Sequence, residues 1–340
     1  MCGISGYLDL HKGVDKHILK EMTDVISYRG PDDEGFALFS EAEVLFAKGK
    51  DSCETRAEKF LCDCNEQGFF MGLGHRRLSI LDLSPLGHQP MEKHGRVMVY
   101  NGEIYNFIEL RSELEQFGYT FTSSCDSEVV LSAYDYWGSQ CVCRFNGMWA
   151  LAIYDPKKKT LFLSRDRFGV KPLYYYKDGE KLIFASEIKQ ILCDPTVPRI
   201  VNNEILAHYV KFNFREYSEE TFFQGIYALR GGCSMTVDID PEARNIQKMD
   251  VHRYYDLNAR VKVHPCEDSA KVVGEALRKA IHLRMRSDVK VGSCLSGGLD
   301  SSSIVGIICD ELKQAHKDAE ELTTVSIGFP NDKDINELGF

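Results

Sequence analysis

The chain opens with the sequence MCGISGYLDL (residues 1–10), in which a strand-like run follows the cysteine at once. Removal of Met1, which is easy before a residue as small as cysteine, would leave a thiol and a free α-amino group on Cys2. An α-amino group has a pKa of about 8, so it can accept the thiol proton at neutral pH, directly or through a water. The thiolate could then attack a carboxamide, release ammonia and leave a thioester for water, without a distant histidine. A cysteine after Met carries little weight alone, so this hypothesis depends on the rest of the chain.

Length and composition limit the possible classes of protein. The chain has 340 residues, 44% of them hydrophobic, which favours two domains or one domain and part of another. The net charge of −10 argues against general nucleic-acid binding and is ordinary for a metabolic protein. The sequence has no N-terminal apolar signal segment and no stretch as long as a membrane span. We therefore expect a cytoplasmic protein that does not bind membranes or nucleic acid, with its 12 cysteines reduced.

The cysteine spacing does not indicate a structural metal site. Cys62 and Cys64 are two residues apart, as are Cys141 and Cys143, and the sequence contains no C-x-x-C. Most of these side chains are expected to be small buried apolar groups. The alternative is a metal site formed by Cys53, Cys62 and Cys64. The prediction is that the chain has no metal site.

The first part of the chain has the pattern of an α+β layered domain. Two amphipathic helices are expected at residues 108–117 and 128–137. The expected strands are residues 69–73, 96–100, 149–155, 160–165 and 182–185, with hairpin tips at 156–159 and 177–180. Residues 41–71 resemble a surface insertion between strands. The irregular, strand-rich stretch from 214 to about 263 is expected to close this domain.

The pattern changes from about residue 265. A helix is expected at 269–285, a strand at 289–295, a helix at 301–312 and a strand at 323–329. This order is a β-α-β unit and the start of a doubly wound α/β parallel sheet. A parallel sheet needs more strands than these and cover on both faces, so we expect this second domain to be incomplete at residue 340. The unfinished sheet would have a bare edge, and we expect the unit to be poorly folded or to need a partner.

Five motifs occur in order: MCGISG at 1–6, RGPDDEG at 29–35, GHRRLSILD at 74–82, NGEIYN at 101–106 and RDRFGVKP at 165–172. Together they resemble the class II glutaminase domain of glutamine-hydrolysing asparagine synthetases. The resemblance implies an N-terminal-nucleophile (Ntn) fold, an αββα sandwich. It also implies a glutamine amidotransferase domain at residues 2–213, a connecting strand-rich segment at 214–264, and a partial ATP-pyrophosphatase synthetase domain at 265–340.

The resemblance also assigns a glutamine site. Asn101 and Gly102 match the oxyanion hole that stabilises the tetrahedral intermediate formed at Cys2. Arg77 matches the arginine that binds the α-carboxylate of glutamine, for which a guanidinium fork is suited. Glu103 and Asp126 match the acidic pair that receives the ammonium group. Two simpler interpretations stay open: a tight turn after a strand at 101–102, and a helix cap at Asp126.

Further residues fall near this site. Arg29 and Asp32 are expected to shape the adjoining loop, and a surface turn around Pro31 explains them nearly as well. The remaining positions where the family lines the glutamine pocket, partly with backbone, are Leu78, Ser79, Ile80 and Leu81.

A second motif, LSGGLDSSS at 295–303, lies between an expected strand and the start of a helix, where backbone N–H groups attract anions. It lacks the spacing and the lysine of a Walker A loop. It resembles the pyrophosphate loop of adenylating enzymes, and the alternative is an ordinary Gly-Gly turn. The resemblance implies that Ser296 and Ser301 hold pyrophosphate and that Asp300 organises magnesium or the loop. The full set of ATP-binding positions is Leu295, Ser296, Gly297, Gly298, Leu299, Asp300, Ser301 and Ile327.

The two sites together imply an ATP-dependent carbon–nitrogen ligase. The resemblance implies that glutamine supplies ammonia, and that aspartate and ATP form β-aspartyl-AMP, which ammonia converts to asparagine with AMP and pyrophosphate. ATP and magnesium are expected, and a prosthetic group is not. Two alternatives remain: an amidotransferase that modifies another carboxylate, and a non-catalytic, truncated remnant. The sequence leaves the oligomeric state open, a homodimer included.

Overall fold

The computed structural model describes residues 1–53, 57–64, 68–261, 268–314 and 322–328. The chain divides into two compact units, Met1–Arg260 and Val261–Phe340.

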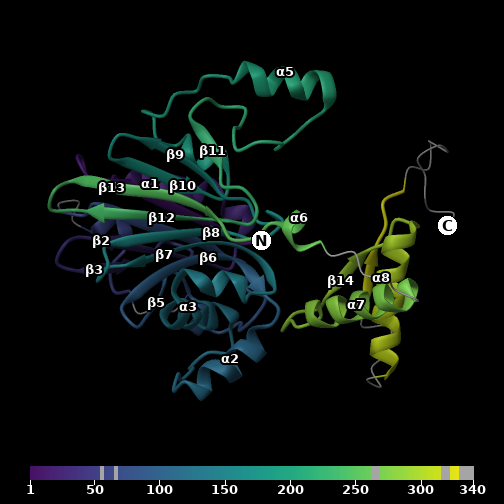
Figure 1. Ribbon diagram of the computed structural model, residues 1–340. Coiled ribbons are helices and arrows are strands. Elements are labelled where there is room, and N and C mark those ends of the chain that lie inside the picture. The colour runs from purple at the N-terminus through teal and green to yellow at the C-terminus, as the bar shows by residue number, and fades with distance from the viewer. Residues whose placement is uncertain (54–56, 65–67, 262–267, 315–321, 329–340) are drawn as a thin grey trace. The chain divides into compact units, whose positions relative to one another are not determined.

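The first unit contains two sheets in which every strand pair is antiparallel (Figure 1). The seven-stranded sheet has, in spatial order, β11 (Ile226–Ala228), β9 (Tyr174–Asp178), β10 (Lys181–Ala185), β1 (Gly3–Asp9), β4 (Met71–Arg77), β2 (Asp33–Phe39) and β3 (Val44–Ala47). The six-stranded sheet has β13 (Asn245–Arg253), β12 (Cys233–Asp240), β8 (Thr160–Arg165), β7 (Gly147–Asp155), β6 (Arg96–Ile104) and β5 (Met91–Lys93).

Side-chain alternation along the strands builds the layers. In β1, Ile4 and Leu8 belong to the core between the sheets, whereas Tyr7 belongs to the cluster on the outer face. In β6, Val97 and Val99 point into the same central core. Their neighbours Met98 and Tyr100 point to the outer face of the six-stranded sheet. β1 and β6 therefore bury side chains on both faces.

Helices cover the two outer faces. Helix α1 (Lys16–Asp24) packs on β1 and β4, and α4 (Ile188–Ile191) packs on β10. Helix α3 (Asp126–Trp137) packs on β5 and β6 and against α2 (Phe107–Gln116), and both lie on the outer side of the six-stranded sheet in Figure 1. The αββα sandwich is therefore confirmed.

Several elements extend past their predicted ends. Strand β8 has the predicted bounds, but β4 continues to Arg77 and β6 continues to Ile104. β6 is longer because β7 pairs with it up to Ile104 and Gly147, a long-range partnership that local patterns do not reveal. The interpretation of 101–102 as a turn after a strand is therefore wrong, since both residues lie inside β6.

The stretch expected to be a surface insertion at 41–71 is partly built into the sheet. It contributes β3, which pairs with β2, and a short 3₁₀ turn at Leu61–Asp63. Ala47, Leu61 and Cys64 are buried in the core beneath α1. Residues 54–56 and 65–67 of this stretch lie outside the described residues.

The strand-rich stretch after residue 213 also joins the sandwich. It supplies β11 to one sheet and β12 and β13 to the other. Helix α5 (Asn203–Phe212) precedes these strands, and α6 (Leu257–Arg260) ends the first unit.

The second unit contains the expected β-α-β order. Helix α7 (Ser269–Arg284) is followed by β14 (Gly292–Cys294), α8 (Leu299–Gln314) and β15 (Thr323–Val325), and β14 pairs with β15 in parallel. The strands are shorter than predicted, and α8 begins two residues earlier. The predicted positions 265–267 and 329–340 lie outside the described residues. Across the described ranges, every helix is too short or too polar to span a bilayer.

Candidate functional site

A pocket forms where β1, β4 and β6 approach one another. It contains nine of the ten residues predicted for catalysis and glutamine binding; only Ser79 is missing from its lining. The lining residues are Met1, Cys2, Arg77, Leu78, Ile80, Leu81, Gln89, Tyr100, Asn101, Gly102, Glu103, Asp126, Ser127 and Lys171.

The thiol of Cys2 is held at the start of β1. The backbone N–H of Leu78 donates a hydrogen bond to Sγ at 3.3 Å. Arg29, which is buried, donates from Nε to the carbonyl oxygen of Cys2 at 3.0 Å and forms an ion pair with Glu187 at 2.8 Å. Burial raises the pKa of the Cys2 thiol, while the Leu78 N–H and the nearby cation of Lys171 oppose that rise. A nucleophile here needs a base and a stabilising charge.

The side chain of Asn101 is buried and lacks a partner. Neither its Oδ1 nor its Nδ2 atom makes a hydrogen bond within the described residues, although the side chain is only 1% exposed. An unpaired buried amide costs about 1–3 kcal/mol of stability, and such groups are uncommon. An orphaned amide in a pocket that also contains Cys2 is a donor available to a ligand.

The N–H of Gly102 points into the same pocket. Along an antiparallel strand, the N–H groups of residues two apart point the same way. In β6, Tyr100 N–H donates to Gln89 Oε1 at 2.7 Å, and Ile104 N–H donates to Asp126 Oδ2 at 2.9 Å. Both acceptors line the pocket, and Gly102 N–H lies between these two bonds on the same edge of the strand. Asn101 and Gly102 therefore offer two donors.

Position 102 requires glycine. A Cβ atom there would lie 2.4 Å from Met148 O and 2.8 Å from the Cα atom of Trp149. Backbone atoms cannot give way as a flexible side chain can. A side chain at position 102 would therefore force β6 and β7 apart.

Arg77 lies at the end of β4 and is 6% exposed. Its guanidinium donates to Ser84 O at 3.0 Å, to Leu81 O at 3.4 Å and also to Asp82 O. These carbonyl groups belong to the loop after β4, so the loop fixes the cation at the pocket wall. Because all three acceptors are neutral backbone carbonyl groups, they do not compensate the positive charge of Arg77, which can attract a carboxylate.

Glu103 and Asp126 provide negative charge in the same pocket. Asp126 Oδ2 accepts from Tyr100 OH at 2.7 Å and from Ile104 N–H. Asp126 is the first residue of α3, and the cap position is Cys125, so the helix-cap interpretation of Asp126 is wrong. Burial raises the pKa of both carboxyl groups, and Asp126 raises that of Glu103 further. A cation bound between the two carboxyl groups would stabilise their ionised forms.

Lys171 is a site residue that was missed from sequence. It is 5% exposed, and no hydrogen bond or ion pair to its ammonium group is found in the described ranges. Burial lowers its pKa, and Cys2 and Glu103 oppose that effect. The motif at 165–172 positions it: Asp166 Oδ2 accepts from Lys171 N–H at 2.9 Å, and Arg165 Nε donates to Lys171 O at 2.7 Å. Its place in that motif was the available signal.

Ser79 contributes to the loop instead of the pocket lining. Its backbone N–H donates to Asp32 Oδ2 at 2.8 Å, so Asp32 anchors the loop that carries Leu78, Ile80 and Leu81. Arg29 and Asp32, both from the RGPDDEG motif at 29–35, therefore hold the backbone of the pocket in place.

The loop of the second unit has the geometry of a strand–turn–helix junction. Leu295 N–H donates to Val325 O at 2.9 Å, and Gly297 has a φ of 78°, a backbone conformation that favours glycine. The hydroxyl groups of Ser296 and Ser301 lie 3.1 Å apart. Leu299 and Asp300 begin α8 beside Gly298, and Ile327 is exposed two residues after β15.

The three cysteines considered for a metal site do not form one cluster. Cys53 lies with Asp33 and His88, and their potential ligand atoms are all within 4.8 Å of one another. Cys62 Sγ contacts Asp63, and Cys64 Sγ donates to Phe60 O.

Comparison with known protein families agrees with this geometry. The glutamine amidotransferase domain family matches residues 64–255, and the asparagine synthase family matches residues 272–340. Asparagine synthetase [glutamine-hydrolyzing] 3 of Bacillus subtilis is 33% identical over 100% of this chain and 50% of its own length. The amidase chry2 of Gibberella zeae is 30% identical over 93% of this chain and 44% of its own length. The chain thus spans about half the length of these curated relatives.

A solved structure shows the same fold. Glutamine phosphoribosylpyrophosphate amidotransferase from Bacillus subtilis matches with a TM-score of 0.52 and 14% identity, covering 98% of this chain and 68% of that chain. The family resemblance drawn from the five motifs is confirmed: the chain belongs to the glutamine amidotransferase family, with an asparagine synthase match following the amidotransferase domain.

Proposed function

We propose that this chain hydrolyses L-glutamine to L-glutamate and ammonia, with Cys2 as the nucleophile. The observation that carries the proposal is the buried, unpartnered amide of Asn101 in the same pocket as the Cys2 thiol. A donor left without a partner in the free protein is available to stabilise an oxyanion that exists only during the reaction.

The first step makes a thioester. After removal of Met1, the α-amino group of Cys2 takes the thiol proton, and the thiolate attacks the carboxamide carbon of glutamine. The carbonyl oxygen becomes an oxyanion, to which the Asn101 amide and the Gly102 N–H donate. The intermediate collapses with cleavage of the C–N bond, and the protonated α-amino group returns its proton to the departing nitrogen. Ammonia leaves, and the γ-glutamyl group stays on Cys2.

The second step returns the free thiol. Water attacks the thioester carbon, the α-amino group takes its proton, and the same two donors stabilise the second tetrahedral intermediate. Cleavage of the C–S bond releases glutamate and the thiolate, which recovers the proton. The site needs no metal or prosthetic group for either step.

Two charged regions of the pocket select an amino-acid substrate. Arg77 would bind the α-carboxylate, and Glu103 with Asp126 would bind the α-ammonium. The raised pKa values of these two acids support this role, since a cation placed between them would favour their ionised forms.

Lys171 would stabilise the thiolate. Its ammonium is in the pocket without a described partner, and its charge lowers the pKa of Cys2. The buried cation therefore favours the reactive form of a thiol whose burial opposes ionisation.

Substrate analogues test this proposal. Ammonia release from L-glutamine is compared with release from glutaramic acid, which lacks the ammonium, and 4-aminobutanamide, which lacks the carboxylate. A charge-assisted hydrogen bond contributes about 1.5–3 kcal/mol, so each analogue should lose at least about 10-fold in kcat/KM. Equal kcat/KM for all three amides would refute the assignment of the charged groups.

For the complete protein we propose ATP-dependent asparagine synthesis. The support is the asparagine synthase match at 272–340 and the serine-rich turn before α8. ATP would be split between its α- and β-phosphates, with pyrophosphate held by Ser296, Ser301 and the helix N-terminus. Asp300, a hard carboxylate donor at the start of α8, fits a magnesium ion that accompanies ATP. Aspartate would accept the ammonia through β-aspartyl-AMP.

The acceptor is tested with a panel of carboxylic acids. Pyrophosphate release is measured in a protein that contains this chain together with the rest of an asparagine synthase domain. Aspartate-dependent release coupled to asparagine formation supports the proposal. Release that depends on a different acid would replace aspartate as the acceptor, an outcome that the match to a relative named amidase makes worth testing.

We also propose a cytoplasmic location. The eleven cysteines in the described part of the chain are all free thiols, as expected in a reducing compartment. Microscopy of a tagged full-length protein tests this, and secretion into the medium would contradict it.

A further inference from the structure

A cluster of three side chains outside the glutamine pocket has the composition of a metal site. Asp33 at the start of β2, Cys53 in the segment after β3, and His88 after the 3₁₀ turn Pro85–Gly87 come from three separate segments. His88 Nδ1 lies 2.7 Å from Asp33 Oδ2 and 3.9 Å from Cys53 Sγ. Asp33 is buried, and the other two are partly buried.

These three side chains bring a nitrogen, an oxygen and a sulfur atom together. His88 Nδ1 faces both the Asp33 carboxylate and the Cys53 sulfur. A cation at the centre would bond to the nitrogen, the oxygen and the sulfur at once. These are the three ligand types that zinc accepts in proteins.

The two distances that involve His88 need only small side-chain movements to fit a zinc ion. Zinc–ligand bonds of roughly 2.0–2.3 Å in a tetrahedron place the ligand atoms about 3.4–3.6 Å apart. The His88–Asp33 pair would open by ~0.7 Å, and the Cys53–His88 pair would close by ~0.3 Å.

The cysteine segment is already fixed to β2 by backbone and side-chain bonds. Cys53 N–H donates to Asp33 Oδ1 at 2.9 Å, and Ser52 Oγ donates to Glu34 O at 2.6 Å. Asp51 N–H also donates to Glu34 Oε1 at 3.0 Å. Hydrogen bonds around a metal site, such as the one from Cys53 N–H to the Asp33 carboxylate, orient the ligands before the metal binds.

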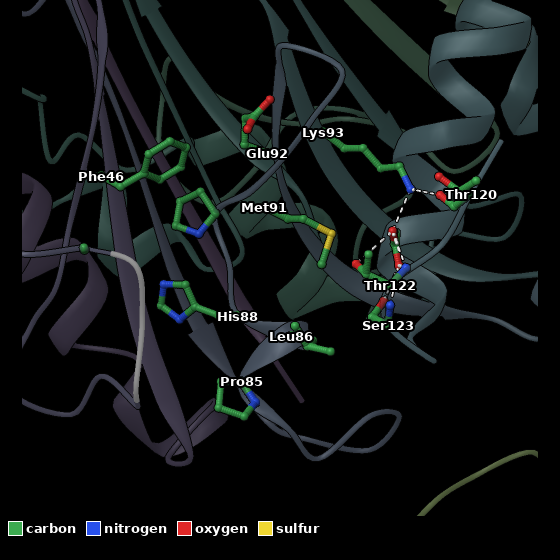
Figure 2. A pocket seen from close by; sticks show the side chains of 13 residues that line it. Phe46, Pro85, Leu86, His88, Met91, Glu92, Lys93, Thr120, Thr122 and Ser123 are labelled. Carbon is green, nitrogen blue, oxygen red and sulfur yellow. Dashed lines mark hydrogen bonds and ion pairs between the residues drawn. The ribbon is translucent and has the colours of Figure 1, made fainter.

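His88 also lines a second pocket, which contains no predicted glutamine-site residue. Figure 2 shows its ring on the pocket wall, on the same side as Phe46 and Pro85. A site with three protein ligands keeps a coordination position for water or a small ligand.

We propose that Asp33, Cys53 and His88 form a binding site for a thiophilic divalent cation such as Zn²⁺. The cation displaces the thiol proton of Cys53 and joins β2 to the segments that carry Cys53 and His88. The next residue, Gln89, lines the glutamine pocket, so the cation would stabilise the region next to the glutaminase site.

Cobalt(II) titration tests this site without relying on enzyme activity. The protein carries Cys2→Ala, so that the thiol of the glutamine pocket cannot contribute. One equivalent of Co²⁺ is expected to give thiolate-to-cobalt charge-transfer absorption, to be displaced by Zn²⁺, and to raise Tm.

Matched cysteine variants locate the ligand. Cys53→Ser is expected to abolish the charge-transfer band and His88→Asn to weaken binding by at least about 100-fold, more than the loss of an outer partner. Cys62→Ser, which changes an exposed cysteine nearby, should bind as before. Absence of the band in the folded parent protein, or an unchanged band in Cys53→Ser, would overturn the proposal.

Discussion

The side chain of Asn101 should matter for catalysis and hardly at all for folding. Asn101→Ala removes the amide donor from the proposed oxyanion hole and leaves the Gly102 N–H in place. Loss of one such donor typically lowers kcat by about 10²–10³, or 2.7–4 kcal/mol of transition-state stabilisation. The ground state gains little from this donor, so KM should change much less than kcat.

The structure also sets the effect on stability. Asn101 makes no side-chain hydrogen bond within the described residues, so its removal leaves no partner unpaired. Relief of an unpaired buried amide, about 1–3 kcal/mol, opposes the cost of a small cavity. We therefore expect the free energy of unfolding to change by less than about 1 kcal/mol.

A matched control separates catalysis from stability. Asn106 Nδ2 donates to Arg144 O at 3.1 Å, and Asn106 Oδ1 accepts from Asn146 N–H at 2.8 Å, outside the pocket. Asn106→Ala should lower stability by about 1 kcal/mol with little change in kcat. The assays are steady-state glutamate release and urea unfolding. Asn101→Ala that loses stability but keeps wild-type kcat would refute the assignment.

Three other substitutions test the pocket. Arg77→Lys should raise KM for glutamine about 10- to 100-fold with a smaller effect on kcat, because lysine lacks the fork that binds a carboxylate; an unchanged KM in steady-state kinetics would contradict this. Lys171→Met removes the charge that lowers the pKa of Cys2, so the rising limb of the pH–rate profile should move to higher pH while Tm stays the same or rises; an unmoved limb would exclude the electrostatic role. Gly102→Ala should cost at least about 1–3 kcal/mol in urea unfolding, because the new Cβ meets the backbone of Met148; wild-type stability would show that the strands can separate there.

The motif residues were grouped through their resemblance to one family, because a single residue such as Cys2 carries little weight alone. Cys2, Arg77 and the Asn101–Glu103 run could be placed in one pocket from sequence, and the structure brings them together. The resemblance also assigned Ser79 to the glutamine pocket, but the structure leaves it out of the pocket lining. The position of Ser79 outside the pocket depends on the hydrogen bond from its N–H to Asp32. Asp32 is distant in the sequence, so no local pattern encodes this bond.

The contributions that sequence reasoning missed come from distant segments. Lys171 enters the pocket from the loop after β8, and its role depends on folding against Cys2, far away in the chain. Tyr100 was predicted only as a strand residue, yet its hydroxyl holds Asp126 from the neighbouring helix. Cys53 was grouped with nearby cysteines, whereas the sheet places it beside Asp33 and His88. In each case, the contact is made with residues that are distant in the sequence.

Strand ends follow the same principle. The hydrophobic alternation of β6 ends near Tyr100, but pairing with β7 continues to Ile104. Asn101 and Gly102, for which a tight turn was the alternative interpretation, therefore lie within the strand that carries the proposed oxyanion hole. In the second unit, the β-α-β order could be predicted, since alternation of apolar runs with a glycine turn is a local signal.

The most direct test of glutamine hydrolysis at Cys2 is glutamate release measured on the wild-type chain and on Cys2→Ala. Intact mass must first show that Met1 has been removed from the folded wild-type sample, and Cys62→Ser serves as the control for loss of a thiol elsewhere. We predict Cys2-dependent release of glutamate and ammonia in equal amounts, retained in Cys62→Ser and abolished in Cys2→Ala. Glutamate release by Cys2→Ala at the wild-type rate, or none from the processed wild-type chain, would contradict an N-terminal cysteine nucleophile.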